Sequence, residues 1–208
     1  ARLAASRSSP TFSSPSTPRM INAAEFAEHA DVTAATREAL AQPFAALVEA
    51  CCASLRAGGK LIFFGNGGSA ADAQHLATEL SVRYIADRKA IPALALTTDS
   101  SALTAIGNDL GFEFLFARQI EALCRKEDMV IGISTSGRST NVTKGLQAAK
   151  EIGARVAALS GKGGGDLVGL ADPLLIVPSS TTARIQEMHI TLGQMLCGAI
   201  EKKLGLAA

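Results

Sequence analysis

The stretch Phe64-Gly65-Asn66-Gly67-Gly68-Ser69-Ala70 decides the fold of this chain, because an apolar run ends there and a helical pattern begins. Lys60-Leu61-Ile62-Phe63 leads into it, and the helical pattern that follows carries Asp72, His75 and Glu79. This order predicts a buried strand, a glycine-rich turn and a helix. The free N–H groups and the dipole at the start of that helix favour an anion. The stretch therefore predicts an α/β fold with a site for a negatively charged ligand.

A second unit of this kind follows further along the chain, where Ile131-Gly132-Ile133 leads into Ser134-Thr135-Ser136-Gly137-Arg138-Ser139. The simpler interpretation is a Ser/Thr helix cap, which needs only one hydroxyl. This loop offers four hydroxyls, and a phosphate can accept hydrogen bonds from hydroxyl and backbone donors together. Two such loops in one small chain indicate a phosphorylated ligand.

Strand and helix patterns alternate through the rest of the chain. Two helices are expected between Asn22 and about Leu55, with Pro43 as a break or a first-turn residue. The expected strands are Leu61–Phe64, Ala93–Thr97, Met129–Ile133, Arg155–Leu159 and Leu174–Val177. The expected later helices are Ala70–Tyr84, Ser101–Ile106, Glu113–Cys124, Asn141–Ile152 and one from the Pro178–Thr182 cap to about Leu204.

Short apolar strands joined by helices predict a doubly wound, five-stranded parallel sheet with N-terminal helices and a long C-terminal helix. In such folds the ligand lies beyond the carboxyl ends of the strands. All the motif loops fall at this edge: Asn66–Ser69, Ser134–Ser139, Ser160–Gly165 and Ser179–Thr182.

Composition limits the classes of function. The chain has 208 residues, a formal net charge of +1 and 48% hydrophobic residues. We therefore expect one domain over residues 20–208, no direct contact with nucleic acid and no membrane association. The cysteine spacing predicts reduced, mostly buried thiols in a cytoplasmic protein. Residues 1–19 are rich in Ser, Thr, Pro and Arg, which predicts a disordered extension, with a remnant of a targeting peptide as the alternative.

The first glycine-rich loop also reads as G-x-G-x-x-A through Gly65, Gly67 and Ala70, which resembles a dinucleotide-binding pattern. That pattern expects an acidic residue about 20 positions later to hold the ribose. The nearest fit is Asp99, which lies too far along the chain. Dinucleotide binding is therefore the weaker interpretation of this loop.

His75 and Glu79 are four residues apart, so they share one helix face and form half of a possible divalent-metal site. The C-terminal helix could add ligands, because Gln186 and Gln194 lie about 80° apart around its axis. His189 lies about 60° from Gln186 on the other side, so we expect it to be a packing or interface residue.

Four motifs together resemble the sugar isomerase (SIS) domain of bacterial phosphoheptose isomerases. They are Gly65–His75, Thr104–Asp109, Ser134–Ser139 and Arg184–Glu187. The resemblance covers roughly Asn22 to Leu204 and implies a flavodoxin-like fold and a homotetramer with sites shared between subunits. It also implies a zinc ion and interconversion of sedoheptulose 7-phosphate and glycero-manno-heptose 7-phosphate, for heptose synthesis in lipopolysaccharide.

The resemblance also implies roles for individual residues. The substrate-binding positions match Asn66, Gly67, Gly68, Ser69, Glu79, Asn108, Asp109, Ser134, Thr135, Ser136, Ser139 and Gln186. The metal-ligand positions match His75, Glu79, Gln186 and Gln194, and Glu79 and Gln194 stand at the catalytic positions.

Gln194 departs from the family pattern, which has a histidine at this position. A glutamine amide binds a metal weakly and cannot exchange a proton near neutral pH. A second hypothesis therefore remains. A related SIS protein has no isomerase activity and is a tetrameric partner of the bacterial replication initiator, with a similar Arg184–His189 stretch. That protein lacks the acidic residue of the first helix, whereas Glu79 is present here, which favours an enzyme.

Overall fold

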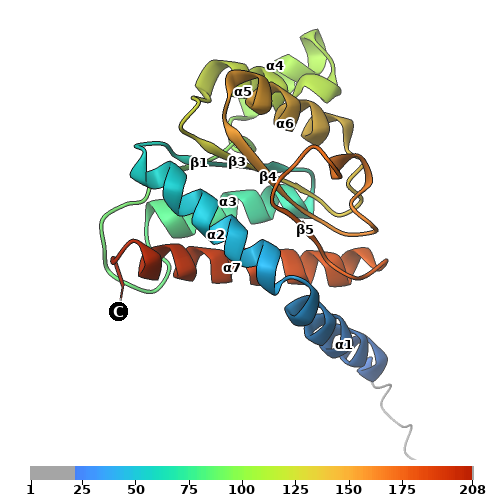
Figure 1. Ribbon diagram of the computed structural model, residues 1–208. Coiled ribbons are helices and arrows are strands. Elements are labelled where there is room, and N and C mark those ends of the chain that lie inside the picture. Colours follow the sequence, from blue (N-terminus) through green and yellow to red (C-terminus); the bar gives the residue numbers. More distant parts are fainter. Residues whose placement is uncertain (1–21, 208) are drawn as a thin grey trace, which may run out of the picture.

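Five short strands form one parallel sheet at the centre of the fold (Figure 1). The computed structural model describes residues 22–207, so the prediction for residues 1–19 lies outside the described residues. The strands are β1 Leu61–Gly65, β2 Ala93–Ala95, β3 Met129–Ser134, β4 Arg155–Ser160 and β5 Leu174–Ile176. Their order is β2-β1-β3-β4-β5, which is the flavodoxin-like order and confirms the predicted fold class.

Helices cover both faces of this sheet. Figure 1 shows α2 (Ala41–Arg56), α3 (Gly68–Ser81) and α7 (Thr182–Lys203) on one face. The other face carries α4 (Ser100–Asp109), α5 (Ala117–Leu123) and α6 (Thr140–Ile152). α1 (Ala23–Ala39) extends from the start of α2 and packs on α7. The short 3₁₀ turns η1 (Phe112–Phe114) and η2 (Gly165–Leu167) complete the chain.

Each face of the sheet has its own apolar core. Phe63 and Leu159 pack with α2, α3 and α7, whereas Phe64 and Val130 pack with α4, α5 and α6. β1 and β3 are buried along their whole length, which is why they read as continuous apolar runs. The mostly buried thiols are confirmed, since three of the four cysteines are buried and all four are free.

Glycines allow α7 to lie directly along α3. A Cβ at Gly193 would stand 2.6 Å from both terminal methyls of Leu76, so a larger residue fits there only if the Leu76 side chain or the helix moves. Gly68, at the start of α3, is in a similar position against the side-chain amide of Gln186. These close contacts bring the side chains of α3 and α7 to one place, which positions the candidate site.

Several predicted boundaries are wrong. The predicted helix Ser101–Ile106 is α4, which continues to Asp109, and the predicted strand Ala93–Thr97 is β2, which ends at Ala95. The predicted helix Glu113–Cys124 is instead a 3₁₀ turn followed by α5, because Phe116 stacks on Phe64 with ring centroids 4.7 Å apart. α3 ends at Ser81 rather than at Tyr84. The guanidinium of Arg88 donates to carbonyl groups in the last turn of this helix. Local spacing carries no signal for either tertiary contact.

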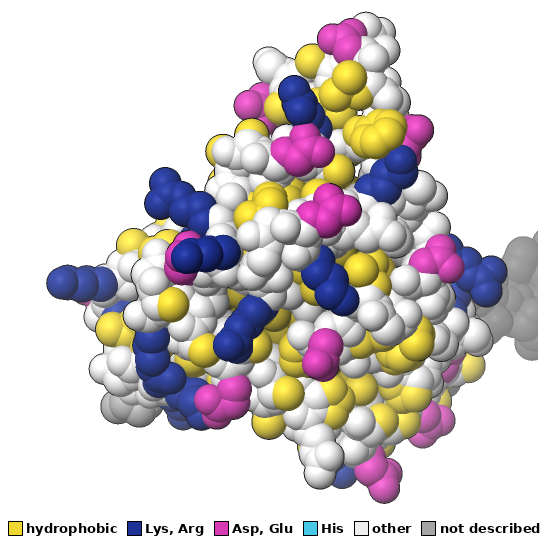
Figure 2. Space-filling model, turned by 45° about the horizontal axis from the view of Figure 1, so that its top comes forward, with side chains coloured by type: hydrophobic (Ala, Val, Ile, Leu, Met, Phe, Trp, Pro, Cys, Tyr) yellow, Lys and Arg dark blue, Asp and Glu magenta, His cyan; other side chains and the backbone are white. Residues whose placement is uncertain are grey.

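The surface carries both signs of charge. Figure 2 shows Lys and Arg side chains interspersed with Asp and Glu over the face that it displays. No helix among residues 22–207 is both long and apolar enough to span a membrane.

Candidate functional site

The predicted loops meet at the carboxyl edge of the sheet. Asn66, which follows β1, exchanges two amide hydrogen bonds with Asn141 in the first turn of α6, at 2.8 and 2.9 Å. Ser134 ends β3 opposite Ser160 of β4, whose hydroxyl donates to the Ser134 carbonyl at 3.0 Å. The first and second loops are therefore joined by side chains, and the second and third by the sheet itself.

Gly137 lets the second and third loops pack without a gap. Its φ is +65°, in the left-handed region that favours glycine, and a Cβ there would overlap the Gly164 carbonyl. The Asp166 N–H donates to the Gly137 carbonyl at 2.9 Å, which closes the contact. Lys162 then links the third loop to the start of α7 through Thr182, at 2.9 Å.

The two helices that begin at the predicted ligand loops lack side-chain caps. Gly67 precedes α3, and Ser139 precedes α6 without using its hydroxyl as a cap. Asn22 caps α1 and Asp99 caps α4, each through a side-chain oxygen, whereas α2, α5 and α7 also begin without a side-chain cap. The first N–H groups of an uncapped helix need an acceptor, and an anion supplies one.

The hydroxyls of Ser134 and Ser139 in the second loop face one another, and Ser139 does not cap the helix. Ser134 and Ser139 have their Oγ atoms 3.0 Å apart, and Ser136 Oγ accepts from the Arg138 N–H at 3.2 Å. Ser134 is buried, whereas Thr135, Ser136 and Ser139 are partly exposed. The simple cap interpretation of this loop is wrong for Ser139, and its hydroxyl is free to turn toward a ligand.

α3 and α7 bring the predicted catalytic side chains together. His75 Nε2 lies 3.1 Å from Glu79 Oε1 on α3, and Gln194 Nε2 of α7 lies 3.4 Å from the same imidazole nitrogen. Glu79 is the less exposed partner, at 22% of its side chain against 45% for His75. One carboxylate, one imidazole and one amide thus converge on a partly open place at the contact between α3 and α7.

These side chains have the spacing of a metal site but a weak ligand set. Two donors of a tetrahedral zinc lie about 3.3 Å apart, close to the distances around His75 Nε2. Within residues 22–207, no three His, Cys, Asp or Glu side chains gather as a metal site. A metal would therefore need the amide oxygens of Gln194 and Gln186 beside His75 and Glu79, and glutamine oxygens are weaker ligands.

Two nearby titratable groups are shifted by burial. Burial raises the pKa of Asp72, partly opposed by His75, and its Oδ2 has no hydrogen-bond partner among the described residues. Burial lowers the pKa of His189 to about 4, against the opposing hydrogen bond with the Ser160 carbonyl at 3.1 Å. The prediction that His189 is a packing residue is confirmed, because it is fully buried.

Asn108 and Asp109 are not brought to this place in the single chain. Both are exposed at the end of α4, where the Asn108 amide donates to Asp109 at 2.7 Å. α4 covers the opposite face of the sheet from α3 and α7 (Figure 1). Their substrate-binding role remains a prediction.

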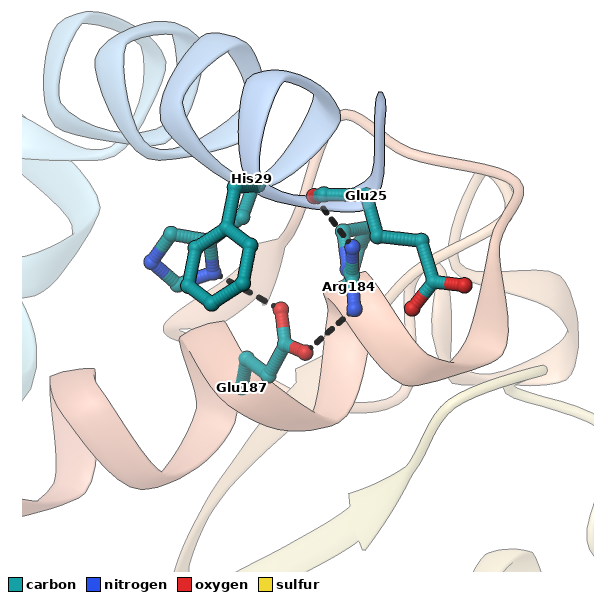
Figure 3. Close-up of a pocket in the computed structure, with 5 residues that line it drawn as sticks. Glu25, His29, Arg184 and Glu187 are labelled. Atoms are coloured by element: carbon teal, nitrogen blue, oxygen red, sulfur yellow. Dashed lines mark hydrogen bonds and ion pairs between the residues drawn. The ribbon is translucent and has the colours of Figure 1, made fainter. Parts of the chain in front are cut away.

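A second polar pocket of about 440 Å³ lies between α1 and the first turn of α7 (Figure 3). Buried Arg184 donates to Glu187 at 2.5 Å and to the Glu25 carbonyl at 2.6 Å, and His29 contacts Glu187 at 2.8 Å. Burial alone would raise the pKa of Glu187, but His29 and Arg184 outweigh it and lower that pKa. The Arg184 charge is already paired with Glu187, and these contacts hold α1 against α7.

Sequence reasoning missed three residues of this region. Asn141 is buried and holds Asn66, and its only signal is an amide directly after a serine loop. Arg88 and Glu201 form a buried ion pair below Glu79, and no spacing rule joins residues so far apart in sequence.

Comparisons with known proteins agree with this arrangement. The family model described as SIS domain matches residues 25–161. The phosphoheptose isomerase of Paramagnetospirillum magneticum is 59% identical over 177 residues, which cover 85% of this chain and 92% of that protein. The solved structure of phosphoheptose isomerase GmhA from Neisseria gonorrhoeae has a TM-score of 0.83 at 44% identity, covering 86% of this chain and 96% of that one. A phosphoheptose isomerase from Francisella tularensis gives 0.84 at 35% identity, covering 86% and 95%.

Proposed function

This chain belongs to the SIS-domain family of phosphoheptose isomerases, and we propose that it interconverts sedoheptulose 7-phosphate and glycero-manno-heptose 7-phosphate at the carboxyl edge of its sheet. It is an isomerase of heptose biosynthesis, as its relatives are named. The alternative, a non-catalytic partner of the replication initiator, is not favoured by these relatives. The single observation that carries the chemistry is the convergence of His75, Glu79 and Gln194 beside the uncapped helix ends.

Substrate binding and the reaction take place at different helices: the start of α6 binds the phosphate, and α3 with α7 carries the reacting groups. The uncapped start of α6 and the hydroxyls of Ser134–Ser139 bind the phosphate of the substrate, which fixes the far end of the sugar. Asn66, held by Asn141, fixes the first loop beside it. C1 and C2 of the bound sugar then lie against the α3–α7 pair.

Glu79 is the base of this reaction. Its carboxylate takes a proton from C1 of the ketose, which leaves an enediolate, and returns a proton to C2 to form the aldose. A second proton moves from the oxygen on C1 to the oxygen on C2, so atoms and charge balance. Gln194 can orient the two oxygens by hydrogen bonds but cannot carry that proton.

We also propose that His75, Glu79, Gln186 and Gln194 hold one zinc ion. The 3.1 Å spacing of His75 Nε2 and Glu79 Oε1 supports this proposal, and the weak amide ligands predict a loosely held ion. A bound divalent ion supplies charge stabilisation for the enediolate oxygens. Zinc affinity, measured by calorimetric titration of the metal-free parent and of His75→Ala, tests the ligand set; equal affinity in both would contradict it.

Quaternary structure and location complete the proposal: a cytoplasmic homotetramer whose sites are shared between subunits. Exposed Asn108 and Asp109 lie away from the α3–α7 pair of their own chain, so a second subunit must bring them to it. Phe112 at 60% exposure and Met195 at 53% are large apolar side chains suited to such contacts. Light scattering that gives a monomer mass would contradict this assembly.

Direct turnover tests the function. The protein is incubated with sedoheptulose 7-phosphate, and the aldose product is detected by nuclear magnetic resonance. We expect conversion of this substrate to an equilibrium mixture of ketose and aldose. We expect slow or no conversion of unphosphorylated sedoheptulose, because it has no phosphate for the Ser134–Ser139 loop to bind. No conversion of the phosphorylated sugar with or without added zinc would contradict the proposal.

A further inference from the structure

Arg88 and Glu201 form an ion pair that is almost completely buried. Arg88 Nε lies 2.7 Å from Glu201 Oε1, and their side chains are 2% and 1% exposed. Arg88 belongs to the connection between α3 and β2, and Glu201 to the last turns of α7. The pair therefore joins the C-terminal ends of the two helices that carry the catalytic side chains.

The remaining donors of Arg88 bind the main chain of α3 at the catalytic base itself. One terminal nitrogen donates to the Glu79 carbonyl at 2.9 Å, and the other to the Leu80 carbonyl at 2.7 Å. These carbonyl groups lie in the last turn of the helix, where helical partners are missing and a cation is favourable. The guanidinium thus fixes the peptide group from which the Glu79 side chain projects.

Glu201 connects Arg88 to α7, the helix that carries Gln194. It stands seven residues after Gln194, and seven residues are 20° short of two full helical turns, so both side chains share one face of α7. Glu201 Oε1 also accepts from the Tyr84 N–H at 3.3 Å. Next to Gln194, Gly193 packs against Leu76, which follows His75 on α3. α3 and α7 are thereby joined at two places: by His75 and Gln194 at the site, and by Arg88 and Glu201 below it.

Stability alone does not account for a pair of this kind. Removing two charges from water costs several kcal/mol per ion, and apolar residues of similar size are often equally stable in such places. What the pair supplies is a fixed geometry, because the planar guanidinium donates to four acceptors at once. They are Glu201 Oε1 and the carbonyl groups of Glu79, Leu80 and Lys89. A displacement of about 1 Å at a reacting group can lower a rate about 100-fold.

We infer that Arg88 and Glu201 are positioning residues for Glu79, which hold its carboxylate at the working distance from His75 and Gln194. This inference rests on the proposed function, since it concerns the base of that reaction. Neither residue touches the sugar. Their loss should therefore lower kcat and leave the KM for sedoheptulose 7-phosphate unchanged, because the phosphate loop belongs to β3 and α6.

The test replaces both charges together in the full chain. Arg88→Met with Glu201→Met leaves no unpaired buried charge, and we expect a folded protein with kcat lowered 10- to 100-fold and KM within about twofold. Arg88→Lys keeps the charge without the planar fork, and we expect a smaller fall of kcat in the same direction. If the double variant does not fold, Arg88→Lys is judged by the same criteria.

Lys60→Met is the control for loss of stability, because it leaves the buried Asp128 carboxylate without its cation. Lys60 pairs with buried Asp128 at 2.5 Å at the amino ends of β1 and β3, far from the α3–α7 site. We expect this control to lower the melting temperature with kcat within twofold of the parent. A folded double variant with the parent's kcat, or an equal fall of kcat in Lys60→Met, would overturn the inference.

Crystal structures separate failure of the inference from failure of the function. If the parent does not convert sedoheptulose 7-phosphate, the proposed function fails, but the structures of parent and double variant still decide the positioning role. A Glu79 carboxylate displaced by about 1 Å or more from His75 supports it. An unchanged 3.1 Å separation in the double variant overturns it.

Discussion

Ser139→Ala separates a phosphate-binding loop from an ordinary helix cap. Ser139 precedes α6, but its hydroxyl makes no capping bond and lies 3.0 Å from Ser134 Oγ. If the hydroxyl binds the substrate phosphate, its removal deletes one charge-assisted hydrogen bond. If it serves only the fold, its removal changes stability and nothing else.

The expected magnitude follows from these contacts. A hydrogen bond to a charged group contributes about 1.5–3 kcal/mol, which corresponds to a rise in KM of about 10- to 150-fold. Loss of the neutral bond to Ser134 should cost about 1 kcal/mol of folding free energy. The fall in kcat should be small, because the phosphate lies at the far end of the sugar from the reacting carbons.

Steady-state kinetics with sedoheptulose 7-phosphate and denaturant unfolding give both quantities. Asn22→Ala is the matched control, since Asn22 does cap its helix by accepting from the Ala24 N–H at 3.0 Å. We expect this variant to lose about 1 kcal/mol of stability as well, with an unchanged KM. The two variants would then have similar stability and very different KM values.

The result that would refute the reasoning is a Ser139→Ala protein with the parent's KM and the stability loss of the Asn22→Ala control. The hydroxyl would then be structural, and the phosphate would bind elsewhere. Adding Ser136→Ala should raise KM further if the loop binds phosphate. A double variant that still binds the phosphorylated sugar normally would remove the whole loop from this role.

Three further predictions test the other parts of the site. Glu79→Gln should lower kcat by about 10²–10⁴-fold with substrate affinity within a few-fold, measured by turnover and calorimetry; turnover near the parent's would remove Glu79 as base. Gln194→His should raise zinc content if the position is a ligand, or the rate at equal zinc if it carries a proton, and no change in either would mean that Gln194 is not at the reacting centre. Burial holds the pKa of His189 near 4, below the pKa of the same residue in the unfolded chain. As the pH falls, the unfolded chain therefore takes up this proton before the folded protein does. The free energy of unfolding should drop by up to about 3 kcal/mol between pH 6.5 and 4. His189→Gln should remove that part of the drop, and unfolding curves of equal pH dependence in parent and variant would contradict it.

Much of the fold could be predicted because its signals are local. Parallel strands buried on both faces read as continuous apolar runs, as in Leu61–Phe64, and Gly153 ends α6 in the left-handed conformation that favours glycine. The four motif loops were predicted to gather at one edge because carboxyl ends of parallel strands meet there, and contacts such as Asn66 with Asn141 agree.

The rest depends on tertiary contacts that no periodicity contains. Phe116 redirects the chain before α5 by stacking on Phe64, more than fifty residues away. Arg88 ends α3 from outside the helix, and its partner Glu201 lies at the other end of the sequence. The family resemblance predicted His75 and Gln194 as site residues. The structure adds that their side-chain nitrogens lie 3.4 Å apart.

The central claim, isomerisation through an enediolate at Glu79, is tested most directly by turnover in D₂O. Sedoheptulose 7-phosphate is converted by the parent and by Glu79→Gln, and the aldose is examined by nuclear magnetic resonance for deuterium on C2. We predict an aldose that carries solvent deuterium on C2 with the parent, and no product above background with Glu79→Gln. Aldose formed equally well by the parent and by Glu79→Gln would contradict the account.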